Sequence, residues 1–149
     1  MCLAIIASIA PEAKGRISAE RLSQLSGLVV SSRKVRGLPS LHFAVTGGCS
    51  CEFLSDSAEF EGETWVLSTE HLAALSHAVL VISKECKKFS FVAHWVNGER
   101  PRGTERVSGS ALAKLVADNK VGNNVLYVVG LPTVFLRGFA ALAAPELAR

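Results

Sequence analysis

Two short glycine signals constrain the fold of this chain, because each favours a tight turn between antiparallel strands. Gly47-Gly48 follows the strand-like segment 41–46, and Asn97-Gly98 follows the strongly alternating segment 89–96. Two-residue turns of these types join neighbouring strands of a hairpin, whereas parallel strands need long crossover connections. The chain is therefore predicted to form an antiparallel or mixed sheet, with a doubly wound α/β fold as the competitor.

Helix signals alternate with the strand signals. Apolar residues spaced by three and four predict a long helix over 69–85, and Ser18 and Ser108 are suited to begin two shorter helices. The polar run 31–36 is predicted to be a loop, and 133–144 a short tail helix. We predict one globular α+β domain over residues 1–149, with a mixed or mainly antiparallel sheet of about five strands and two or three helices packed on one face.

Composition limits the classes of partner. The chain is 49% hydrophobic and carries a formal net charge of +3, which excludes overall disorder and gives little drive for phosphate binding. Nucleic-acid binding is therefore the weakest of three functional hypotheses, and it depends on dispersed basic residues: Arg33, Lys34, Arg36, Arg100, Arg102 and Arg106. No membrane partner is expected. A homodimer could form through an edge strand near 99–106 or through the tail helix.

The first apolar segment and the cysteines indicate a compartment. Segment 2–10 has the length of a buried strand and lacks the basic start of a secretory signal. Four cysteines in such a chain suggest reduced thiols instead of a disulfide framework. We therefore expect a cytoplasmic protein. Cys2 is expected to be an ordinary residue of the first strand, with an N-terminal nucleophile as the alternative.

The most specific motif is Cys49-Ser50-Cys51, directly after Gly47-Gly48. If the two glycines form a two-residue turn, the return strand begins at Cys49 and residues 46, 44 and 42 lie opposite 49, 51 and 53. Cys49, Cys51 and His42 then share one face of the sheet. The Cα atoms of the two cysteines would be about 6.5 Å apart, at the outer limit for a disulfide.

Three interpretations of this motif follow. Cys49, Cys51 and His42 could bind a soft ion, with zinc as the candidate cofactor and copper(I) as the alternative, and with Cys86 or His94 as further ligands. A thiol-dependent enzyme could instead use Cys51 or Cys49 with His42 as base. The cysteines could also simply pack as small apolar side chains. The leading hypothesis is a small binding or regulatory domain that holds a metal, and whether the chain is an enzyme stays open.

Overall fold

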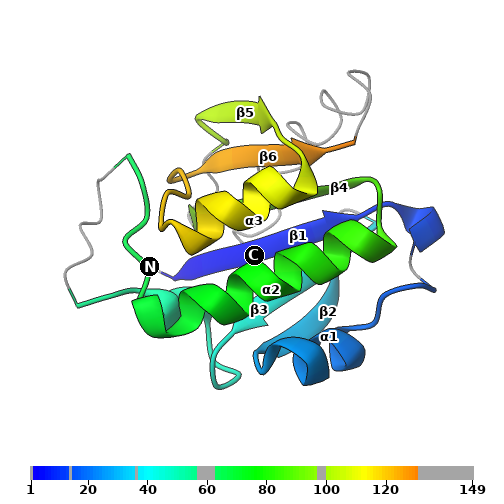
Figure 1. The fold of residues 1–149 in the computed structure, drawn as a ribbon, viewed down its shortest axis with the longest axis horizontal. Helices are drawn as coiled ribbons and strands as arrows, with labels where there is room; N and C mark the ends of the chain where they lie inside the picture. Colours follow the sequence, from blue (N-terminus) through cyan, green and yellow to red (C-terminus); the bar gives the residue numbers. More distant parts are fainter. Residues whose placement is uncertain (1, 14, 36, 57–62, 97–99, 131–149) are drawn as a thin grey trace.

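The computed structural model describes residues 1–149 except 1, 14, 36, 57–62, 97–99 and 131–149. Helices and strands alternate along the chain (Figure 1). Their order is β1 (Leu3–Ile9), η1 (Pro11–Ala13), α1 (Ala19–Ser26), β2 (Val29–Val35), β3 (Leu38–Ala44), η2 (Ser50–Phe53), α2 (Thr69–Glu85), β4 (Phe89–Trp95), β5 (Gly103–Arg106), α3 (Gly109–Ala117) and β6 (Val125–Val129).

The strands form one mixed sheet in the order β2-β3-β1-β4-β6-β5. The central strand β1 runs antiparallel to both neighbours, pairing Ile6 with His42 on β3 and with Val92 on β4. The only parallel pair of described strands is β5 with β6. The predicted α+β class with a mixed sheet is confirmed, and the sheet has six strands where about five were expected.

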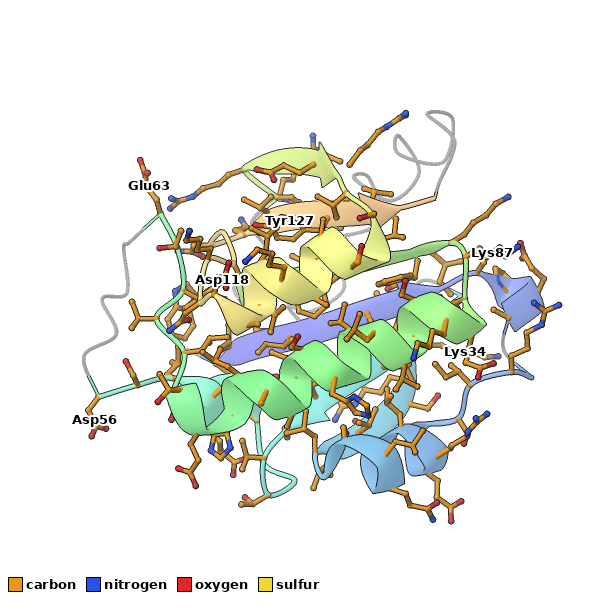
Figure 2. The ribbon with its side chains drawn as sticks, in the orientation of Figure 1. Lys34, Asp56, Glu63, Lys87, Asp118 and Tyr127 are labelled. Carbon is orange, nitrogen blue, oxygen red and sulfur yellow. The ribbon has the colours of Figure 1, made fainter. Side chains whose placement is uncertain are left out.

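The three α-helices that the structure describes lie on one side of the sheet, which we call the helix face (Figure 1). Alternate strand residues such as Ile5 and Phe91 pack there against α2 residues such as Leu75 and Ile82, and all four are fully buried. Tyr127 of β6, labelled in Figure 2, is buried in the same core and accepts a 2.8 Å hydrogen bond from the Gly122 N–H. This large apolar layer joins the helices to the sheet.

The other side of the sheet, which we call the second face, has a different composition. It holds a small apolar cluster: Ala4, Ile6, Val92, Leu126 and Val128. Polar side chains surround that cluster. They are Ser8, Ser40, His42, Ser90 and His94, as the strand registers show. Ser40, Ser90 and His94 are buried.

The predicted helix starts are confirmed. The Ser18 and Ser108 hydroxyls accept hydrogen bonds from the N–H groups of Arg21 and Ala111, each at 3.1 Å. The first helix ends earlier than its apolar pattern suggests, because Gly27 adopts a left-handed conformation with φ of 75° and its N–H bonds the Ser23 carbonyl. The Lys114–Asp118 ion pair lies at the end of α3 (Figure 2).

The predicted loop over 31–36 was wrong, because most of it belongs to strand β2. This strand pairs with β3 along its whole length, from Val29 with Ala44 to Val35 with Leu38. It is an edge strand with mostly exposed side chains, so it lacks the apolar alternation that marks a half-buried strand.

The predicted return strand after Asn97-Gly98 does not pair with β4. Residues 97–99 lie outside the described residues, but β5 begins at Gly103 and lies beside β6, in parallel. On its two sides β4 pairs instead with β1 and β6. The predicted tail helix over 133–144 also lies outside the described residues. Among the helices that the structure describes, none is long and apolar enough to cross a membrane.

Candidate metal centre

The segment after β3 does not return as a strand, so the predicted hairpin at Gly47-Gly48 was wrong. It bends and enters η2 (Ser50–Phe53). The Glu52 carboxylate accepts hydrogen bonds from the N–H groups of Val45 and Thr46, at 2.9 and 2.8 Å, and from the Thr46 hydroxyl. These N–H groups are thus satisfied by a side chain, which removes the need for a partner strand.

The short helix η2 fills a gap between β1 and β3. The ladder between these strands covers only Ile6 to Ser8 of β1. Beyond it, the Ile5 N–H donates to the Ser50 hydroxyl at 2.9 Å, and that hydroxyl donates to the Phe43 carbonyl at 2.6 Å. Ser50 therefore bridges the two strands where they no longer pair, and this places the neighbouring cysteines at the start of β1.

Three cysteines meet at this point. The Sγ atoms of Cys2, Cys49 and Cys51 all lie within 4.8 Å of one another. Cys2 immediately precedes β1 and is exposed, whereas Cys49 and Cys51 are half-buried. All three are free thiols.

Backbone N–H groups hold the cysteine sulfurs in place. The Leu3 N–H donates to Cys51 Sγ at 3.1 Å, and the Cys51 N–H donates to Cys49 Sγ at 3.3 Å. Both distances suit hydrogen bonds to sulfur, which are longer than those to oxygen because sulfur is the larger atom. The cluster is therefore built by local hydrogen bonding as well as by the fold.

The environment of Cys51 keeps its thiol protonated. Burial, and then the hydrogen bond with Cys49, raise the pKa of Cys51 to about 11, although the Leu3 N–H acts in the opposite direction. The neighbouring Cys49 and Cys2 raise this pKa further, because nearby thiolates would repel one another. A metal cation between the sulfurs would instead lower the pKa of the thiols, since metal coordination deprotonates thiols.

The sulfur spacing suits a single ion. Zinc–sulfur bonds of about 2.3 Å in tetrahedral geometry place two sulfurs about 3.8 Å apart. Sulfurs already within 4.8 Å reach that spacing by small side-chain rotations. Within the described part of the chain, no further histidine, cysteine or carboxylate completes this set at the same spacing. The cluster therefore offers three ligands and leaves a fourth position to another molecule.

His42 does not join the three-cysteine group. It lies on β3 and on the second face, where burial, then Arg33 and then His94 lower its pKa to about 4. Its Nε2 atom is buried and has no hydrogen-bond partner among the described residues. The structure thus brings together Cys49 and Cys51 of the predicted ligands, but not His42.

The other predicted further ligands also lie outside this group. Cys86 is buried at the end of α2, and His94 is buried on β4 with its Nδ1 atom 3.0 Å from the Trp95 carbonyl. The third member of the group is Cys2, which the sequence analysis took as a residue of the first strand or as an N-terminal nucleophile and not as a candidate ligand. Cys2 stands directly before an apolar segment that the sequence predicts to be a strand. That position alone does not place it near Cys49 and Cys51, because the contact between η2 and this strand is not visible in the sequence.

Comparisons with protein-family models, curated proteins and solved structures found no match to this chain.

Proposed function

We propose that this protein is a zinc-binding domain whose ligands are the thiolates of Cys2, Cys49 and Cys51. The mutual approach of the three sulfurs within 4.8 Å carries this proposal. Thiolates favour soft and borderline ions such as copper(I) and zinc. Three protein ligands with a free fourth position are typical of zinc sites that bind or activate a small molecule, whereas structural zinc sites are usually closed by four protein ligands.

The alternative of a thiol-dependent enzyme has less support. A catalytic cysteine needs a lowered pKa, whereas burial raises the pKa of Cys51 to about 11. His42 is outside the cysteine group, and its pKa near 4 makes it a weak base. Free thiols at all four cysteines agree with the reducing, cytoplasmic setting that we propose for this domain.

Zinc analysis of untagged protein, purified with reductant and without oxygen, tests the proposal. We expect one zinc per chain. Cys51→Ser should weaken zinc binding by about 100-fold or more, because it removes a ligand and not only a group that orients one. Cys86→Ala is the matched control, since Cys86 lies outside the cluster, and it should retain the zinc.

Two results would contradict the proposal. Protein without stoichiometric zinc, even after dialysis against the ion, would remove the metal site. Retention of zinc by Cys51→Ser at unchanged affinity would place the ion elsewhere. A competition experiment with copper(I) identifies the ion: the proposal requires that zinc still occupies the site when copper(I) is limiting.

A further inference from the structure

A pocket of about 570 Å³ adjoins the cysteine cluster. Cys2 and Cys49 line it together with residues of β2 and β3, including Arg33 and His42. This volume lies in the range of small-molecule sites. The same two thiols therefore belong both to the proposed zinc centre and to the pocket wall.

The pocket extends along the strands away from the cysteines. Val29 pairs with Ala44 near the cysteine end, and Arg33 pairs with Ser40 four residues further along β2. Four residues of strand correspond to about 13 Å. Val29, Ala44 and Val96 contribute apolar wall near the cysteine end, and the paired residues Ser31 and His42 lie between the two ends. The pocket is thus long enough to hold a molecule of several bonds with different groups at its ends.

The pocket wall is positively charged away from the cysteines. Arg33 and Lys34, the latter labelled in Figure 2, are exposed residues that line it, and alternation along β2 turns Arg33 toward the second face and Lys34 toward the helix face. Neither forms an ion pair with a described residue. The lining residues that the structure describes include no aspartate or glutamate. An unpaired guanidinium on the second face, without an acid among the described lining residues, favours an anionic group of a ligand.

We propose that this pocket binds an anionic low-molecular-weight thiol, with its carboxylate at Arg33 and its sulfur as the fourth ligand of the zinc ion. This inference rests on the proposed zinc centre. Sulfur matches the three thiolates in softness, and the apolar wall beside the cysteines accommodates the carbon atoms next to the sulfur. On binding, the thiol releases its proton to water and forms one zinc–sulfur bond that replaces a zinc-bound water. No electron is transferred.

Calorimetric titration of the zinc-loaded protein under reducing, oxygen-free conditions tests the inference. Three probes separate the contacts: reduced glutathione has both groups, S-methylglutathione keeps the carboxylates but blocks the thiol, and 2-mercaptoethanol has the thiol without a carboxylate. We expect glutathione to bind about tenfold or more tightly than either of the others. Cobalt(II)-substituted protein should gain thiolate charge-transfer absorption with glutathione and not with its S-methyl form.

Variants separate the anion contact from the metal contact. Arg33→Gln should weaken glutathione binding about tenfold, with unchanged zinc content and unchanged affinity for 2-mercaptoethanol. Lys120→Gln is the matched control, because it also removes one exposed cation but follows α3 on the helix side and does not line the pocket. It should leave glutathione binding unchanged.

The possible failures are distinguishable. If the protein binds no zinc, the proposed function fails, and this inference fails with it. If zinc binds but S-methylglutathione matches glutathione, the sulfur contact is wrong while the zinc centre stands. If Arg33→Gln binds glutathione as tightly as the unchanged protein, the anion contact is wrong.

Discussion

The two faces of the sheet are both buried, yet they differ in what they bury. Phe91 and Val92 are neighbours on β4 and lie on opposite faces, the first in the large core under the helices and the second in the small cluster. The helix face contains large apolar side chains, whereas the second face also buries Ser40, Ser90 and His94. Apolar packing thus supplies stability on one face, and the other accommodates polar groups, a pocket and the approach to the cysteines.

The largest expected effect compares the neighbours Phe91 and Val92. Phe91→Ala should lower the free energy of unfolding by about 3–5 kcal/mol, because it leaves a cavity in the core beneath the helices. Val92→Ala removes two methyl-sized groups from a smaller cluster and should cost about 1–2 kcal/mol. Urea unfolding of both variants measures the difference. Equal losses would mean that the two faces contribute alike.

A smaller effect concerns pH and the histidines of the second face. The pKa of His42 falls from 6.5 to about 4 in the folded protein, and burial also lowers the pKa of His94. As the pH falls, the unfolded chain therefore binds protons on these histidines at a higher pH than the folded protein does. Stability is complete above about pH 7.5 and is lost as the pH falls through 6.5 toward 4, by about 1–2 kcal/mol for the half-buried His42.

Unfolding measured between pH 5 and 7.5 tests this loss, before the acidic side chains titrate. His42→Leu should flatten the pH dependence, leaving the part due to His94. It should also maintain or raise stability at pH 7.5, because it removes a buried nitrogen without a described partner. An unchanged pH profile in this variant would contradict the assignment to His42.

The smallest effect comes from a partly buried pair of hydroxyl groups. Ser8 and Ser40 share a 2.9 Å hydrogen bond on the second face, and the Ser40 hydroxyl also donates to the Leu38 carbonyl at 3.3 Å. Ser40→Ala should cost about 1 kcal/mol, since it leaves the Ser8 hydroxyl without this partner. Ser32→Ala, on the exposed side of β2, is the control and should change little. Urea unfolding that shows equal effects would contradict a role for the pair.

Sequence reasoning succeeded where local patterns decide the structure. The alternation of 89–96 gave β4, the apolar spacing of 69–85 gave α2, and the hydroxyls of Ser18 and Ser108 begin helices as expected. These features depend on residues close in sequence. They supplied the elements of the α+β class, but its preference over a doubly wound fold depended on the two glycine signals, and neither is followed by the predicted antiparallel partner strand.

It failed where side-chain contacts to the backbone decide the structure. Gly47-Gly48 resembled a hairpin turn, but Glu52 satisfies the neighbouring N–H groups, and Ser50 bonds β1 across 45 positions of sequence. No local pattern reports either contact. Two of the three residues of the predicted site, Cys49 and Cys51, lie together for a local reason, since they are two residues apart. The third cysteine, Cys2, directly precedes β1, which is the strand that Ser50 contacts.

The bond from the Leu3 N–H to Cys51 Sγ makes the first residues of the central strand depend on a sulfur atom where a neighbouring strand would otherwise support them. An ion that fixes that sulfur would also fix the strand. Hydrogen–deuterium exchange of the Leu3 and Ile5 amides should therefore slow when zinc is bound, because local opening of this strand end would be suppressed. The exchange rate of amides at the start of β1 would then report whether the metal centre is occupied.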